Sequence, residues 1–380
     1  MGFTILTRAR CNFGVLPSLN GIRLDGFFIL DLFGQLKYDC PQMIRNVLFS
    51  LVFLLTSNLA FSQWFADPGY SPDSLAQLKP GENSLSVFWW NVRSADLNSY
   101  YFKKYKKNVL DENLIEIASL ENAPDVLILG EFFEPHHGPG TYARLKEHYP
   151  FAEEFPYNAE GSPLSILVLS KFPFTYHYEV NAIDWAPIDS SVRDREKYKQ
   201  DWVNHYQFQK ANTQFTRSFQ SVRVKKNGQF YSIAPTHISQ PWAIMGRVDG
   251  KLLTVSALLE GTQNPYYNSV LHYRRVLEKY EDSISTQEPF LAIGDFNIPS
   301  TLFKVAPVGF KELGSNLVDV PIHGPYKTFP ARSAPVDTVM PAMNLDHGLT
   351  RQNVNTDEAV SPRLMGSDHY PLWLVISSKN

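Results

Sequence analysis

The sequence predicts an α/β protein whose layered sheets are buried on both faces. Short segments rich in β-branched and aromatic residues alternate with longer segments of helical spacing. The short segments are apolar throughout, which is typical of strands that are covered on both sides. The chain has 380 residues, 44% of them hydrophobic, which is ample for a large core. Its length would permit two domains, but α/β sandwiches of this size also fold as one unit.

The expected elements follow one another along most of the chain. We expect strands at 84–92, 125–131, 162–170 and 289–297, and further strand segments around 344–350 and 371–377. A hairpin is expected from strands 218–226 and 229–236, joined by Asn227-Gly228. Helices are expected at 99–122, 248–261 and 266–283, and a long polar loop at 182–216.

The N-terminal part has the layout of a secretory signal peptide. A single positive charge, Arg45, precedes an apolar run that ends near Ala60, and Ala60-Phe61-Ser62 forms a small-residue cleavage site before Gln63. The run is short for a membrane span, which needs about 20 residues, and the alternatives are an uncleaved anchor or a buried helix. We therefore expect a secreted or periplasmic protein with four parts: 1–42, an upstream extension from a mis-assigned start codon; 43–62, the signal peptide; 63–83, a linker; and 84–380, the folded domain.

Removal of this leader changes the cysteine count and the charge. Cys11 and Cys40 both precede the signal, so the mature chain needs no disulfides. Residues 63–380 carry 30 basic and 35 acidic residues, a net charge of −5, which weakly disfavours a protein that grips duplex nucleic acid. A local basic surface is still available in the 182–216 loop, from Arg193, Arg195, Lys197, Lys199 and Lys210.

Polar or ionisable residues stand at the ends of the apolar segments. If these strand ends lie on one rim of the sheets, the side chains converge in a cleft. Several carboxylates without a matching cluster of Lys or Arg would repel one another, and a bound divalent cation is the usual remedy. Carboxylate and amide oxygens suit Mg²⁺, and also Mn²⁺ or Ca²⁺. The residues concerned are Asn91, Glu131, His237, Asp295, Asn297, Asp346, Asp368 and His369.

The motifs WN, GE, TH, GDFN, LDH and SDH, in this order, resemble those of the endonuclease/exonuclease/phosphatase superfamily, which has the deoxyribonuclease I-like fold. The resemblance covers about residues 84–377 and extends to GSPLSILVLSKFPF and to the Arg-bearing helix before GDFN. It implies a four-layer α/β sandwich, in which two packed mixed β-sheets are flanked by helices. The chain departs from the family at Gly130, where Gln is usual, and the tyrosine of some family nucleases has no matched position.

The resemblance implies a metal side of the site. Glu131 matches the metal-binding glutamate, with Asn91 beside it, and Asp368 matches a second carboxylate on that side. Asp295 matches the residue that positions the attacking water, and Asn297 would hold the phosphate or Asp295. These last two residues would share one face of an extended strand. The alternatives are a loop glutamate at 131, a turn cap at 91 and a simple Asp–Asn turn in GDFN.

The resemblance also implies a phosphate side. His237 and His369 match the histidines that contact the phosphate and stabilise the transition state, and Asp346 matches the carboxylate that orients and charges His369. Three further residues are expected to line the substrate site: Arg217, Trp242 and Arg274. Other histidines are expected to be ordinary polar residues, although the first two could line the cleft: His136, His137 and His347.

Together these residues predict a Mg²⁺-dependent phosphoesterase that hydrolyses a phosphodiester or phosphomonoester by in-line attack of water, and an endonuclease-like phosphodiesterase in the first place. One alternative is a phosphatase or phosphodiesterase of phospholipids or inositol phosphates. Another is a catalytically silent binding protein, which is disfavoured because each core motif position holds the expected residue type. The expected partner is a phosphoester substrate: nucleic acid, a phospholipid head group or an inositol phosphate. No obligate protein partner is evident in the sequence, and we expect a monomer.

Overall fold

The computed structural model describes twelve stretches of the chain: residues 78–92, 109–157, 164–184, 216–238, 247–248, 251–252, 265–297, 317–321, 328, 344–362, 364 and 366–379. All of them lie in one compact unit, Asp67–Asn380. The predicted signal peptide and most of the 182–216 loop lie outside the described residues. No helix among the described residues is long and apolar enough to cross a membrane.

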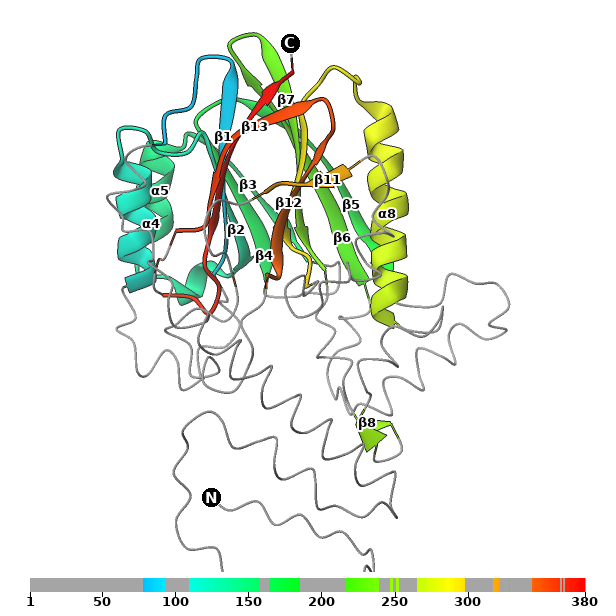
Figure 1. Cartoon of the computed structure of the whole chain (residues 1–380). Helices are drawn as coiled ribbons and strands as arrows, with labels where there is room; N and C mark the ends of the chain where they lie inside the picture. Colours follow the sequence, from blue (N-terminus) through cyan, green and yellow to red (C-terminus); the bar gives the residue numbers. More distant parts are fainter. Residues whose placement is uncertain are drawn as a thin grey trace, which may run out of the picture. The chain divides into compact units, whose positions relative to one another are not determined.

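Two six-stranded mixed sheets form the centre of this unit (Figure 1). The first sheet has the order β13-β14-β1-β2-β4-β3, with strands Val354–Val360, Leu372–Ser378, Ser84–Asn91, Val126–Phe132, Ser165–Ser170 and Phe151–Pro156. The second has the order β11-β12-β10-β7-β6-β5, with strands Leu317–Asp319, Asp346–Arg351, Phe290–Asp295, Gln229–His237, Thr216–Lys226 and Phe174–Asp184.

Helices cover the outer faces of both sheets. Helices α4 (Val109–Ser119) and α5 (Thr141–His148) lie against the first sheet, and α8 (Pro265–Ser283) lies against the second (Figure 1). The inner faces of the two sheets share one apolar core, in which Val87 and Ile128 of the first sheet pack with residues such as Ile233 and Ile293 of the second. This is the predicted four-layer sandwich. The burial of both sheet faces explains why the strands are apolar throughout.

The strand pairings bring the polar strand ends to one rim. Strands β1 and β2 are parallel, and Asn91 pairs with Gly130, next to Glu131. In the second sheet β7 and β10 are parallel, with His237 opposite Asp295, and β12 runs antiparallel from Asp346, also opposite Asp295. Parallel neighbours end at the same edge of a sheet, so a site at this rim follows from the topology.

Two connections between strands, β6 to β7 and β8 to β9, follow from turn residues in the sequence. The predicted hairpin between β6 and β7 is confirmed, and its turn residues Asn227 and Gly228 have φ of 50° and 83°, as a two-residue turn of this type requires. The predicted helix at 248–261 is wrong at its start, because β8 (Arg247–Val248) pairs with β9 (Lys251–Leu252). The sequence between these strands is Asp-Gly, a hairpin signal that outweighs the helical spacing.

The remaining helix predictions hold where the structure describes them. Helix α4 occupies residues 109–119 of the predicted 99–122 segment, and α8 matches the predicted 266–283 helix. Besides β8 and β9, the sequence analysis did not anticipate six elements: α5, β3, β5, β11, β13 and the short 3-10 helix η3 (Glu134–His136). These four missed strands of the two large sheets, β3, β5, β11 and β13, all lie at sheet edges and have mixed burial, so they lack a continuous apolar run.

Candidate active site

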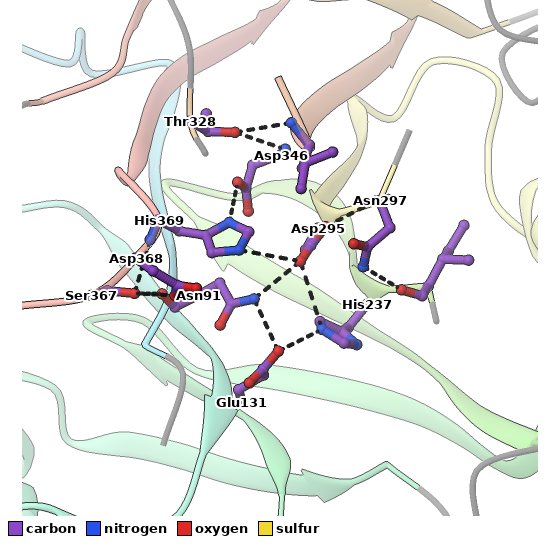
Figure 2. Close-up of polar contacts among 12 residues, drawn as sticks. Asn91, Glu131, His237, Asp295, Asn297, Thr328, Asp346, Ser367, Asp368 and His369 are labelled. Carbon is purple, nitrogen blue, oxygen red and sulfur yellow. Dashed lines mark hydrogen bonds and ion pairs between the residues drawn. The ribbon is translucent and has the colours of Figure 1, made fainter. Parts of the chain in front are cut away.

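The predicted strand-end residues form one buried polar group between the two sheets (Figure 2). Asn91 Nδ2 donates hydrogen bonds to Asp295 Oδ2 at 3.0 Å and to Glu131 Oε1 at 3.3 Å. The same Glu131 oxygen, Oε1, lies 3.1 Å from His237 Nε2. Glu131 and Asn91 come from the first sheet, and Asp295 and His237 come from the second. The group therefore joins the sheets through side chains.

Asp295 lies between the two predicted histidines. Its Oδ2 atom is 3.7 Å from His237 Nε2 and 3.8 Å from His369 Nε2, and the residue is fully buried. Burial and the nearby charge of Asp346 raise the pKa of Asp295 to about 6, against the opposing effect of the two histidines. A carboxyl group with this pKa exchanges protons close to neutral pH, as a general base must.

Asp346 holds His369 in a fixed orientation. Its Oδ2 atom is 2.7 Å from His369 Nδ1. Burial alone would lower the pKa of His369, but the charge and hydrogen bond of Asp346, with the charges of Asp295 and Asp368, raise it to about 10. His369 is therefore a proton donor at neutral pH.

Two residues that the sequence analysis did not single out hold Asp346 in turn. Trp89 Nε1 donates to Asp346 Oδ1 at 2.8 Å, and Thr328 Oγ1 accepts the backbone N–H of Asp346 at 3.1 Å. Trp89 gave no signal beyond that of an aromatic core residue. Thr328, in the sequence Thr-Phe-Pro at 328–330, was given no role in the sequence analysis.

The geometry at GDFN corrects one argument about this motif. Strand β10 ends at Asp295, and Asn297 has a φ of 52°, so these residues do not share a face of an extended strand. Instead the backbone N–H of Asn297 donates to Asp295 Oδ1 at 2.8 Å, which is the turn chemistry of the alternative interpretation. The Asn297 side chain donates to the Ile238 carbonyl at 2.7 Å. The turn fixes the Asp295 carboxylate.

The other candidates have different surroundings. Asp368 is buried and lies 3.5 Å from Ser367 Oγ, which itself donates to the Asn91 carbonyl at 2.6 Å. Arg217 packs over the ring of Tyr157, 5.3 Å from its centroid. Arg274 pairs with Glu278 on α8 at 2.7 Å. Its role, like that of Asp368, stays a prediction, and Trp242 lies outside the described residues.

Two glycines permit close approaches at the site. A Cβ atom at Gly130 would lie 2.5 Å from the indole ring of Trp89, so the departure from the family's Gln matches the ring that occupies this space. A Cβ atom at Gly294 would lie 1.9 Å from the Thr236 carbonyl oxygen, which explains the Gly before Asp295. Larger residues at either position would push apart the strands that carry the site.

The site residues fit a divalent cation. Four carboxylates, those of Glu131, Asp295, Asp346 and Asp368, are at most 7% exposed and share the site with two histidines. Two groups of three residues each offer ligand atoms within 4.8 Å of one another: Glu131, His237 and Asp295, and then Asp295, Asp346 and His369. Excess buried negative charge is costly unless a cation offsets it, and oxygen-rich donor sets suit Mg²⁺, Mn²⁺ or Ca²⁺.

Comparisons with known proteins agree on the fold. No family model matches the chain, and no curated protein matches its sequence. Among solved structures, SmcL is 15% identical, covering 78% of this chain and all of its own, with a TM-score of 0.50. Sphingomyelinase C from Streptomyces griseocarneus (17% identity, 78% and 99% coverage, TM-score 0.49) and a Staphylococcus aureus beta toxin with bound magnesium ions (16%, 78% and 100%, 0.49) are also similar. At 15% identity the likeness to SmcL shows the fold alone, which is the deoxyribonuclease I-like sandwich.

Proposed function

We propose that this protein, which has the deoxyribonuclease I-like fold, is a divalent-metal-dependent phosphoesterase that cleaves a phosphodiester by in-line attack of water. The observation that carries the proposal is the position of Asp295. Its buried carboxylate lies within 4 Å of two histidines and accepts a hydrogen bond from Asn91. This arrangement offers a base, proton donors and a cation site at one place, which is what phosphoester hydrolysis needs.

Residues of the first sheet would hold the cation. Glu131, with Asn91 beside it, supplies oxygen ligands at the rim, and Asp368 adds negative charge nearby. A bound Mg²⁺ supplies charge stabilisation for the phosphoryl oxygens as negative charge develops on them. Asn91 Nδ2 donates to both Glu131 and Asp295, so it would help to hold the two carboxylates in place.

Asp295 and His237, from the second sheet, and His369, which precedes β14 of the first sheet, would carry the proton chemistry. Asp295 orients a water molecule and accepts its proton, helped by the turn at Asn297 that fixes its other oxygen. His369, kept protonated by Asp346, donates a hydrogen bond to a non-bridging phosphate oxygen. His237 binds the phosphate from the side of Glu131.

Nucleic acid is the substrate we propose first, as for an endonuclease-like phosphodiesterase. The predicted loop at 182–216 contains basic and aromatic residues that suit a phosphate backbone and bases. Hydrolysis of a phospholipid or of an inositol phosphate, with no cleavage of DNA, would instead assign the same chemistry to a smaller phosphoester.

Two substitutions test the assignment of the site. His237→Ala and Asp295→Ala should each lower the hydrolysis rate by about 10²–10⁴, the usual cost of losing an acid–base group. Full activity in both variants would contradict the assignment. Calorimetric titration with Mg²⁺ and Mn²⁺ tests the alternative of a catalytically silent binding protein. We expect the wild type to bind these cations and Glu131→Gln to bind them more weakly. No binding by the wild type would favour the silent binding protein.

We also propose that the protein is exported. The sequence at 43–62 has a charged start, an apolar stretch and a small-residue cleavage site. N-terminal sequencing of the protein from the culture medium or periplasm should begin near Gln63. A start elsewhere, or retention in the cytoplasm, would contradict the proposal.

A further inference from the structure

We propose that Tyr157 is a positioning residue that sets how Glu131 and His237 face each other across the two sheets. The functional consequence of this role rests on the proposed function, because these two residues are the proposed cation ligand and phosphate contact. Tyr157 belongs to neither set of predicted site residues. It contacts both partners directly, and its own backbone is fixed between the sheets.

The backbone of Tyr157 is anchored on both sides. Its N–H donates to the Leu164 carbonyl at 3.1 Å, beside β4 of the first sheet. Its carbonyl accepts the N–H of Ser218, on β6 of the second sheet, at 2.7 Å. The preceding residue, Pro156, accepts a hydrogen bond from Tyr178 of β5 at 3.0 Å. Tyr157 therefore has a position defined by both sheets.

The hydroxyl group of Tyr157 fixes the backbone of Glu131. Its oxygen accepts the Glu131 N–H at 2.6 Å. Glu131 has a φ of 54°, which is unfavourable for a residue with a side chain, and the pairing of β2 with β4 shifts register between Leu129 and Phe132. The shift leaves Glu131 outside the regular strand ladder. The phenol supplies the hydrogen-bond partner that the strand does not, and it holds the strained backbone that directs the carboxylate into the site.

The ring of Tyr157 fixes the imidazole of His237. The two rings are stacked, with centroids 4.8 Å apart and planes 17° from parallel. His237 Nδ1 is buried and makes no hydrogen bond within the described part of the chain. His369 differs, because Asp346 holds its Nδ1 atom. Stacking on Tyr157 therefore orients the His237 ring, whereas a hydrogen bond to Asp346 orients that of His369.

Arg217 completes this support. Its guanidinium group lies 5.3 Å from the centroid of the Tyr157 ring, a cation–π distance. Burial lowers the pKa of Arg217, against the opposing charge of Glu131. Burial also raises the pKa of Tyr157 well above its ordinary value, so the phenol stays protonated and acts through its contacts. Arg217, predicted as a substrate contact, has a supporting role through Tyr157 in the described structure.

The test compares Tyr157→Phe and Tyr157→Leu with Tyr231→Phe in the full-length protein. Tyr231 is a matched control: it is fully buried, its hydroxyl donates to the Asn83 carbonyl at 2.8 Å, and it lies six residues before His237 on β7. Mg²⁺ affinity is measured by calorimetry and kcat/KM with plasmid DNA. The His237 imidazole signal is followed by NMR with ¹³C-labelled histidine and is assigned with His237→Gln.

The two variants should separate the two contacts. Tyr157→Phe should weaken Mg²⁺ binding and lower kcat/KM by about 10–100-fold, as is usual when a group that supports a metal ligand is lost, with the His237 signal little moved because the ring remains. Tyr157→Leu should also shift the His237 Cε1–H signal downfield, because the shielding aromatic face is lost. Tyr231→Phe should change none of these quantities by more than about twofold.

The positioning role of Tyr157 and the proposed phosphoesterase function would be overturned by different results. Mg²⁺ affinity in Tyr157→Phe equal to that in Tyr231→Phe would overturn the role toward Glu131, and an unmoved His237 signal in Tyr157→Leu would overturn the role toward His237. Wild-type protein that neither binds Mg²⁺ nor hydrolyses a phosphoester would contradict the proposed function. The NMR comparison would still decide the positioning of His237, because it needs neither metal nor substrate.

Discussion

Trp89 shows how one side chain can serve the core and the site together. It is fully buried in the apolar core between the sheets, yet its indole N–H donates to Asp346, which in turn holds His369. The two oxygens of Asp346 thus have separate partners, Trp89 on Oδ1 and His369 on Oδ2. A buried carboxylate with both oxygens occupied has little freedom to rotate, so His369 is held indirectly by the core.

Trp89→Phe tests this arrangement. It removes the indole N–H and keeps an aromatic ring, so Asp346 Oδ1 loses a donor, and we expect kcat to fall about tenfold, at the low end of what supporting groups contribute. Trp373→Phe is the matched control, because Trp373 is equally buried and its indole N–H donates at 2.7 Å to Ser86 Oγ, which is not one of the proposed site residues. Steady-state kinetics in both variants provide the measurement. Equal losses would mean that the effect of Trp89 is general destabilisation.

Trp89 on β1 packs closely against Gly130 on β2. This contact should affect the free energy of unfolding. Because an added Cβ at Gly130 would meet the indole ring at 2.5 Å, Gly130→Ala should lower the free energy of unfolding by about 1–3 kcal/mol, the usual cost of overpacking. The smaller ring of Trp89→Phe makes room, so the double variant should recover part of this loss. Urea unfolding of the four proteins gives the coupling energy. Strictly additive effects would show that the two residues do not constrain each other.

Helix α4 is tied to the segment after Glu131 by hydrogen bonds of Asp111. Asp111, in the first turn of α4, lies 2.8 Å from His137 Nδ1 and accepts the Gly138 N–H at 2.6 Å. His137 stacks on Phe132, the residue that follows Glu131 in the chain, and the two ring centroids are 4.9 Å apart. His137 was expected to be an ordinary polar residue, and this contact gives it a structural role.

The Asp111 contact predicts a pH dependence of stability. Burial would raise the pKa of Asp111, but the hydrogen bonds with His137 and Gly138 outweigh it and lower the pKa below its usual value. A lowered carboxyl pKa stabilises the fold above the unfolded-state value, near about 3.9, and this contribution is lost as the pH falls through both values. Wild type should therefore be more stable than Asp111→Asn at pH 7, with a difference that shrinks below about pH 4. Thermal unfolding of both proteins from pH 7 down to below about pH 4 checks this prediction. A stability difference that does not change with pH would contradict it.

For the whole molecule, the sequence predicted the features that many strands share. The apolar strands indicated sheets covered on both faces, and the polar residue at each strand end indicated a shared rim. The parallel pairs β1–β2 and β7–β10 place those ends together, which is why Asn91, Glu131, His237 and Asp295 could be grouped before any contact was known.

Contacts that depend on side-chain direction were not predictable. Tyr157 follows an edge strand of mixed burial, and nothing in its neighbours shows that it reaches Glu131 and His237. Trp89 differs from other core aromatics only in where its N–H points. The Asn297 geometry was misjudged because a strand was assumed to continue past Asp295, where the chain turns. Periodicity reports which face is buried, and it does not report which buried atoms meet.

The site between the two sheets is proposed to hydrolyse phosphoesters with the help of a divalent cation. The most direct test is to measure the nicking of supercoiled plasmid by the purified wild type with Mg²⁺ and with a chelator, and by Asp295→Ala with Mg²⁺. We expect the wild type to nick the plasmid with Mg²⁺ and not with the chelator, and Asp295→Ala to be at least about 10²-fold slower. Nicking that persists in the chelator or in Asp295→Ala would contradict the proposed mechanism. A folded, metal-binding protein that leaves the plasmid intact would contradict the proposed nucleic-acid substrate.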